Sequence, residues 1–164
     1  VTGVQNVCSS DLQEQAWHDA LAFKPDVVVI KLGTNDSKPE NWQHANEFEH
    51  DLLQMIDQLN PRQPVLNKKG KPTKKLTRSA KPRIYLCTPI PAVKPTWNIS
   101  DSIIQNTIIP IINKVAQQEG LNVIDLHTLF KPDNENIQSD GIHPTDKGAR
   151  QMAEIIAREL KAEK

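Results

Sequence analysis

The 164-residue sequence is poor in cysteine and in aromatic residues, and it has no long hydrophobic run. Its two cysteines, Cys8 and Cys87, are too few for a disulfide framework, and neither has a histidine or cysteine at metal-ligand spacing. No apolar run approaches the ~20 residues that cross a membrane, so we expect no membrane partner. The formal net charge is +0, so any attraction to a polyanion must be local.

The sequence does contain enough hydrophobic residues, 37% of the total, for one core. We therefore expect a single domain over residues 1–164. Hydrophobic periodicity predicts helices at residues 12–23, 46–59 and 100–120 and from 145 onward, and strands at 27–32, 83–87 and 122–126. Pro110 predicts a kink in the third helix. The alternation of strands and helices predicts a parallel sheet covered by helices, which is an α/β fold.

A first polar motif, Gly33-Thr34-Asn35-Asp36, directly follows the strand expected at 27–32. Ligands bind at the carboxyl ends of the strands in open α/β sheets. Gly33 allows a sharp turn that would let the Asn35 amide face a cleft and donate to an oxyanion. The alternative is a polar loop with an Asx turn, which this motif alone favours.

A second motif, Asp140-Gly141-Ile142-His143, precedes a proline and a helix that Thr145 is expected to cap. A carboxylate three residues before a histidine can accept a hydrogen bond from Nδ1, which leaves Nε2 as a general base. The alternative is a capping histidine beside a turn aspartate, and for the isolated motif this is at least equally favoured.

The stretches "LGTND" and "DGIHP" together resemble the third and fifth blocks of the SGNH hydrolases, also called GDSL esterases. "YLCTPIPA" and "GLNVIDLH" extend the resemblance toward carbohydrate O-acetylesterases such as sialate and xylan deacetylases. The resemblance implies a flavodoxin-like three-layer α/β/α fold and ester hydrolysis through an acyl-enzyme. It also implies a small-molecule or carbohydrate ester as substrate, no cofactor or metal, and a secreted or periplasmic location.

The resemblance assigns a role to each matching residue. Asn35 becomes an oxyanion donor, and Gly33 and Asp36 become residues that contribute to or support the oxyanion site beside it. His143 becomes the general base and Asp140 its orienting partner. Gly3, in "VTGVQ", resembles the second block, whose glycine amide is another oxyanion donor. A glycine in a frayed terminus is the alternative, and both interpretations of Gly3 stand.

The nucleophilic serine of the family has no counterpart in this sequence. Ser9 and Ser10 have no strand before them, so they do not fit a nucleophile turn. We expect the serine to lie upstream and the 164-residue chain to be inactive alone. The family's first strand would then also be missing, which predicts that the strand at 27–32 has no partner. Residues 6–12 resemble a translated sequencing-adapter junction, so we interpret residues 1–12 as a doubtful or non-native terminus.

Four further polar or aromatic residues follow the carboxyl ends of expected strands. Trp42 and Trp97 are candidates for a substrate wall, because indole faces suit sugar rings, and each could instead anchor a loop. Asp125 and His127 are interpreted as supporting residues, because the loop at 140–143 already supplies a base and its partner.

Residues 61–82 combine lysines and arginines with prolines and a glycine, and they contain no acidic residue. The prolines and the glycine predict an inserted loop, which should lie opposite the carboxyl ends of the strands because it follows a helix. A basic cluster can bind phosphates or an acidic polysaccharide. Single-stranded nucleic-acid sites interleave aromatic residues, and this loop has none, so we expect no nucleic-acid partner. A solvated, mobile insertion is the favoured interpretation.

Three functions therefore remain after the sequence has been considered. The first is a serine esterase that removes acetyl groups from carbohydrate. The second is a catalytically dead, carbohydrate-binding pseudo-enzyme, and the third is a polyanion-binding protein that acts through residues 68–81. The oligomeric state is left open.

Overall fold

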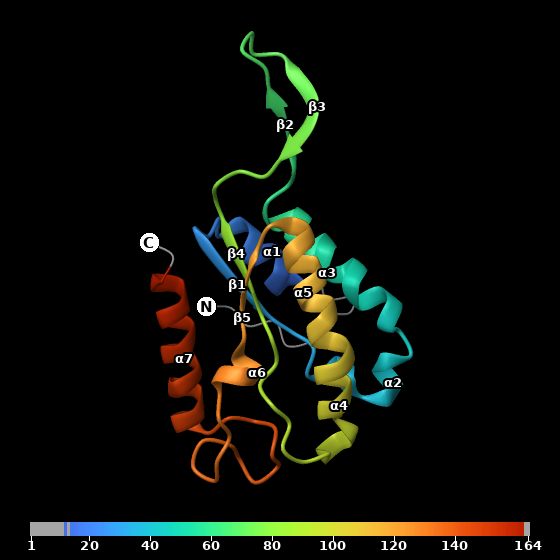
Figure 1. Cartoon of the computed structure of the whole chain (residues 1–164), viewed down its shortest axis with the longest axis vertical. Helices are drawn as coiled ribbons and strands as arrows, with labels where there is room; N and C mark the ends of the chain where they lie inside the picture. The colour runs from blue at the N-terminus through green and yellow to red at the C-terminus, as the bar shows by residue number, and fades with distance from the viewer. Residues whose placement is uncertain (1–11, 13, 163–164) are drawn as a thin grey trace.

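The main sheet has three parallel strands in the order β1 (Val27–Lys31), β4 (Arg83–Cys87) and β5 (Asn122–Ile124) (Figure 1). The structure is a computed structural model, and it describes residue 12 and residues 14–162. β1 pairs with β4 along its whole length, from Val27 opposite Arg83 to Lys31 opposite Cys87. The prediction that this strand has no partner was therefore wrong, because β4 supplies one. On its other edge β1 has no strand partner within residues 14–162.

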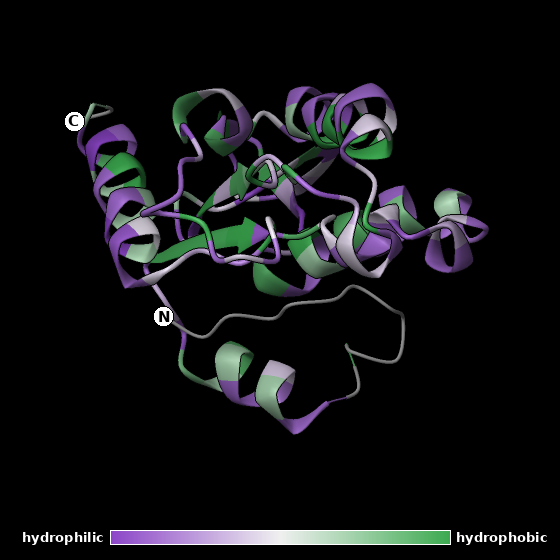
Figure 2. Cartoon of the chain, turned by 90° about the horizontal axis from the view of Figure 1, so that it is seen from below, coloured by the Kyte–Doolittle hydropathy of each residue, from purple (hydrophilic) through white to green (hydrophobic). Residues whose placement is uncertain are grey.

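Helices cover both faces of this sheet. Alternate residues of β4 face opposite ways, so Ile84 and Leu86 enter one hydrophobic cluster while Tyr85 and Cys87 enter another. The first cluster packs under α3 (Ala45–Leu59) and α5 (Ile109–Glu119), and the second under α6 (Leu126–Leu129) and α7 (Asp146–Lys161). Figure 2 shows hydrophobic strands between helices with hydrophilic outer surfaces. The arrangement is the predicted three-layer α/β/α sandwich.

Within the described residues, the remaining α-helices are α1 (Gln15–Ala22), α2 (Pro39–Trp42) and α4 (Asp101–Ile103). α1 packs through Trp17, whose Nε1 donates to Gln58 Oε1 of α3 at 2.6 Å. In the part of the chain that is described, no helix is both long enough and apolar enough to cross a membrane.

The helix predicted at 100–120 consists of several segments. Ser100 caps its first segment, with its hydroxyl accepting from Ile103 N at 3.3 Å. Ile104–Ile108 is π-helical, and α5 begins at Ile109. Pro110 therefore lies two residues after the π-helical segment, as the second residue of α5. Gly120 ends α5 with φ +65°, as predicted.

Residues 61–82 are not a structureless loop but contain an antiparallel hairpin of β2 (Gln63–Leu66) and β3 (Pro72–Thr77). Prolines are tolerated here because each strand of a two-stranded ribbon has an outer edge whose N–H groups need no partner. The hairpin projects from the end of the molecule opposite the carboxyl ends of the parallel strands (Figure 1). Its predicted position is therefore confirmed, while its predicted local structure was wrong.

Candidate active site

His143 and Asp140 form the hydrogen-bonded pair that the sequence predicts. His143 Nδ1 lies 2.9 Å from Asp140 Oδ2. Asp140 Oδ1 accepts from the backbone N–H of His143 at 3.0 Å and of Ile142 at 2.8 Å. The backbone N–H of His143, that of Ile142 and the imidazole outweigh desolvation and lower the pKa of Asp140 to about 2. A carboxylate only accepts, so Nδ1 carries the proton and Nε2 of the neutral ring is left as an acceptor.

The loop that carries this pair is held by α7 and by tight backbone packing. Thr145 caps α7, its hydroxyl accepting from Gly148 N at 3.2 Å. A Cβ at Gly148 would lie 2.0 Å from Asn136 O, so only glycine fits against this loop. Gly141 has φ +75°, and a Cβ there would lie 2.7 Å from Lys94 Cβ. The carboxylate and imidazole are thus presented by a loop with little freedom to shift.

The segment between β4 and α4 lies against the same loop. Thr96 Oγ1 donates to Asp140 O at 2.6 Å, and Lys94 Nζ donates to Ser139 O at 2.7 Å. The Trp97 ring lies 5.5 Å from the His143 ring, centroid to centroid, in an edge-on arrangement. Trp97 is 56% exposed and His143 side-chain atoms are 55% exposed, so both face solvent beside each other.

Trp42 has a different environment from Trp97. It ends α2, is half-buried, and its ring lies 6.1 Å from that of Phe48, a core residue. It packs against the cluster under α3 and α5. The structure therefore favours the loop-anchor interpretation of Trp42 over that of a substrate wall.

The Gly33 loop is shaped by close packing and by its own hydrogen bonds. Gly33 has φ +113°, and a Cβ there would lie 2.6 Å from Ile108 Cγ2, so a side chain would meet both strain and a clash. Asn35–Ser37 forms a 3-10 turn, and the Asn35 carbonyl accepts from Asn41 Nδ2 at 2.8 Å. Asn35 and Asp36 are half-buried at the carboxyl end of β1.

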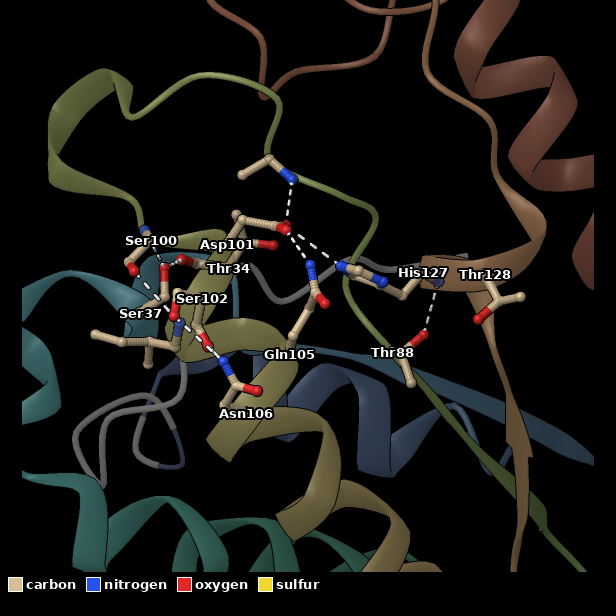
Figure 3. Close-up of polar contacts among 12 residues, drawn as sticks. Thr34, Ser37, Thr88, Ser100, Asp101, Ser102, Gln105, Asn106, His127 and Thr128 are labelled. Carbon is tan, nitrogen blue, oxygen red and sulfur yellow. Dashed lines mark hydrogen bonds and ion pairs between the residues drawn. The ribbon is translucent and has the colours of Figure 1, made fainter.

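Buried hydrogen bonds connect the Gly33 loop to α4 (Figure 3). The Ser37 side chain is fully buried, and its hydroxyl donates to Thr34 O at 2.7 Å while accepting from Ser100 N at 3.1 Å. Asp101 then holds the start of the preceding segment, its Oδ1 accepting from Ala92 N at 2.8 Å. The segment 92–100 consequently contacts both the Gly33 loop and the His143 loop.

His127 contacts Asp101 and so supports this segment, and both His127 and Asp125 bond to Thr88, in line with their interpretation as supporting residues. His127 Nε2 lies 3.3 Å from Asp101 Oδ1, and His127 N donates to Thr88 Oγ1 at 2.9 Å (Figure 3). Asp125 is not the end of a strand but the cap of α6, accepting from Thr128 N and Thr88 Oγ1, both at 3.1 Å. The predicted strand at 122–126 is shorter because this cap starts a helix.

Comparison with known proteins identifies the family. Residues 2–151 match the model of the GDSL-like lipase/acylhydrolase family. The chain belongs to this family. It is 59% identical over 151 residues to an acetylxylan esterase from Xylanibacter ruminicola, an alignment that covers 92% of this chain and 32% of that protein. The chain thus spans about a third of the length of that relative.

Solved structures agree with the family assignment. An acetyl xylan esterase, AlAXEase, is 25% identical with a TM-score of 0.65, covering 92% of this chain and 75% of that one. A lipase/acylhydrolase from Enterococcus faecalis has a TM-score of 0.66 at 22% identity, covering 94% of this chain and 69% of that one. The SGNH, or GDSL, resemblance and the flavodoxin-like fold it implies are therefore confirmed.

One residue predicted for this GDSL-family site, Gly3, lies outside the described residues. Ser9 and Ser10, which do not fit a nucleophile turn, also lie outside the described residues. Within the described chain, no serine hydroxyl is hydrogen-bonded to His143, and no three His, Cys, Asp or Glu residues are grouped to hold a metal. A hollow of about 350 Å³ lies beside the hairpin base at the opposite end of the sheet, and none of the predicted site residues lines it.

One part of the site in this family member, the hydrogen bonds of Asp101, was not predicted from the sequence. The Asp101 carboxylate contacts the backbone of Ala92 and the side chains of Gln105 and His127. Gln105 Nε2 donates to Asp101 Oδ2 at 2.5 Å. Because these residues have the i, i+4 spacing of a helix, this contact could have been predicted from the sequence. The contact with His127 spans 26 positions, which no local pattern reveals.

Proposed function

We propose that the intact protein hydrolyses carboxylic esters through an acyl-enzyme and that its substrates are O-acetylated carbohydrates. The His143–Asp140 pair carries this proposal, because it presents an oriented imidazole beside an ionised carboxylate at the carboxyl end of a parallel sheet. The 59% identity to an acetylxylan esterase supports the acetylated-sugar substrate.

The nucleophile in this proposal is a serine outside the 164 residues. Its hydroxyl attacks the acetyl carbonyl while His143 Nε2 takes the proton. The imidazolium then protonates the leaving sugar oxygen, and the acetyl group stays on the serine. Water then attacks this ester while Nε2 takes its proton, and the imidazolium returns that proton to the serine oxygen as the bond to the acetyl group breaks and acetate leaves. Asp140 stabilises the imidazolium in both steps because it remains a carboxylate.

Asn35 is the proposed oxyanion donor. It follows β1 directly, at the edge of the sheet where the His143 loop also lies, and the close packing of Gly33 fixes the turn before it. Removing one such donor costs roughly a hundredfold to a thousandfold in kcat. The backbone amide of Gly3 is proposed as a second donor.

Trp97 is the proposed contact for the sugar. Its indole is exposed, and the hydrogen bond from Thr96 to Asp140 holds it beside the His143 ring. A large, rigid apolar face beside the base would orient the ring that carries the acetyl group. Trp97→Ala should therefore raise KM for acetylated xylo-oligosaccharide more than it raises KM for p-nitrophenyl acetate.

The test compares acetate release by the longer protein with that by the 164-residue chain. In the longer protein, His143→Ala should lower kcat by more than about a thousandfold. His50→Ala is the matched control, because His50 is exposed on α3 and contacts Gln54, and it should retain full activity. The 164-residue chain alone should show no turnover of p-nitrophenyl acetate. Turnover by that chain that His143→Ala abolishes would place the nucleophile inside it, and unchanged activity of the longer His143→Ala variant would refute the role of His143.

A further inference from the structure

The β2–β3 hairpin carries a concentration of positive charge that ester hydrolysis does not use. Residues 61–82 hold eight of the 20 lysines and arginines and none of the 20 acidic residues. The rest of the chain therefore has 12 basic against 20 acidic residues. The net charge of zero is therefore the sum of a basic segment, residues 61–82, and an acidic remainder of the chain. We call residues 61–82 the arm and the remainder of the chain the body.

Some of these charges are neutralised where the arm joins the body. Arg78 Nη2 lies 2.6 Å from both Glu119 Oε2 and Asp57 Oδ1, and Arg62 also pairs with Glu119. Lys81 pairs with Asp26. The other basic residues form no ion pair with the described residues, and all are exposed: Lys68, Lys69, Lys71, Lys74 and Lys75.

The tip of the hairpin is a structured turn. Asn67 Oδ1 accepts from Lys69 N at 2.9 Å and from Lys71 N at 3.1 Å. Asn67 N donates to Lys71 O at 2.8 Å, and Gly70 adopts φ +72°, which closes the turn. The tip lysines therefore project from a backbone held by its own hydrogen bonds.

The base of the hairpin is also fixed in direction. Asn60 at the end of α3 accepts from Ser79 N at 3.2 Å and donates to Ser79 O at 3.0 Å. Together with the Arg78 ion pairs, these bonds tie the arm to the ends of α3 and α5. An arm fixed at both tip and base loses less conformational entropy on binding than the mobile loop that the sequence favoured.

We propose that this lysine arm binds carboxylate-bearing polysaccharide and so holds the protein on an acidic, acetylated polymer. The proposal rests on the proposed function, because a polysaccharide esterase meets such polymers as substrate. Five unpaired lysines match a chain of carboxylates in charge. Residues 61–82 contain no aromatic side chain on which a nucleic-acid base could stack.

The position of the arm restricts what the bound molecule can be. The arm leaves the amino-terminal end of the sheet, whereas His143 lies at the carboxyl end (Figure 1). The five residues of β1 alone separate these ends by roughly 16 Å. A small ester cannot reach both sites, so the arm should lower KM for acidic polymers and leave kcat for small esters unchanged.

The test measures retardation of the 164-residue chain in native gels that contain polygalacturonate, a polymer of carboxylate-bearing sugars. The variant Lys68→Gln/Lys69→Gln/Lys71→Gln keeps Asn67 and Gly70, so the turn should remain. We expect roughly tenfold weaker binding from the loss of three charges. The parent chain should also lose binding as salt is raised.

The matched control removes three exposed positive charges elsewhere, in Lys131→Gln/Arg150→Gln/Lys161→Gln, and should bind within about twofold of the parent. Equally weakened binding of polygalacturonate by both variants would show that only the net charge matters, and it would overturn the proposal. Undiminished binding by the tip variant, equal retardation by neutral arabinoxylan, or tighter retention by poly(dT) would also overturn it. Equal circular dichroism melts establish that the variants are folded.

Polysaccharide binding by the arm and ester hydrolysis at His143 can be refuted independently of each other. Binding is measured without turnover, so an arm that holds polygalacturonate stands even if the longer protein releases no acetate. Conversely, acetate release from small esters by the longer protein stands even if the tip variant binds as well as the parent.

Discussion

The ion pair beneath the hairpin gives a quantitative test of the structure. The Glu119 side chain is 3% exposed, and it accepts from Arg78 Nη2 at 2.6 Å and Arg78 Nε at 3.2 Å. Burial alone would raise the pKa of Glu119, but the hydrogen bonds from Arg62 and Arg78 outweigh burial and lower it. Glu119→Gln removes this charge and leaves the guanidinium of Arg78, which is 12% exposed, with Asp57 and the Asn60 carbonyl.

The expected cost follows from how much of the network survives. Removing one partner of a buried ion pair destabilises a protein by about 3–5 kcal/mol. Because Arg78 keeps two acceptors, we expect the lower end, about 3 kcal/mol. For a chain of this size, that corresponds to a fall in Tm of roughly 6–12 °C.

Urea unfolding followed by circular dichroism measures this loss. The control is Glu135→Gln, because Glu135 and its partner Lys147 are 72% and 61% exposed, and that change should cost less than about 1 kcal/mol. The folded-state pKa of Glu119 is depressed, so its stabilisation is complete above the ordinary value of 4.5 and is lost as pH falls below it. The difference in the free energy of unfolding between the parent and Glu119→Gln should therefore become smaller below that pH. Equal losses for the two variants at pH 7, or a gap that widens in acid, would refute the account.

Three other measurements test the packing and the site. Gly33→Ala should destabilise by about 1–3 kcal/mol more than Gly120→Ala, because both need positive φ but only Gly33 is crowded; equal melting temperatures would contradict this. Asp140 has its pKa lowered from 3.8 to about 2, so Asp140→Asn should lower stability at pH 7, and the difference should disappear as pH falls through that interval. A difference in stability as large at pH 2 as at pH 7 would contradict the hydrogen bonds that the Asp140 carboxylate accepts in this loop. Burial raises the pKa of the Cys87 thiol to about 12, so iodoacetamide at pH 8 should label Cys87 only after unfolding, and a labelled Cys87 peptide from the native chain, told apart from the Cys8 peptide by mass spectrometry, would show that strand to be open.

Local signals predicted those parts of the fold that local chemistry determines. The apolar run at 83–87 is β4, Gly120 ends α5 in a left-handed conformation, and Thr145 caps α7. The pairing of His143 with Asp140 was also predictable, because three residues in one tight loop bring these side chains together. Each of these features depends on residues close in the sequence.

Features that depend on distant residues were not predictable in this way. Trp42 and Trp97 have similar sequence contexts, yet packing against Phe48 half-buries one while the hydrogen bond from Thr96 to Asp140 holds the other at His143. The hairpin was mistaken for a loop because its prolines were weighed without the open edges of a two-stranded ribbon. Its anchor at Glu119 lies 41 positions from Arg78.

The most direct test of the proposed chemistry is to locate the serine that His143 activates. The longer protein is treated with an organophosphate that labels activated serines, and the modified peptide is identified by mass spectrometry. We expect one labelled serine outside the 164 residues, in a turn after a strand, and we expect His143→Ala to abolish the labelling while His50→Ala leaves it intact. Labelling of a serine within residues 1–164, or labelling that does not depend on His143, would contradict the account.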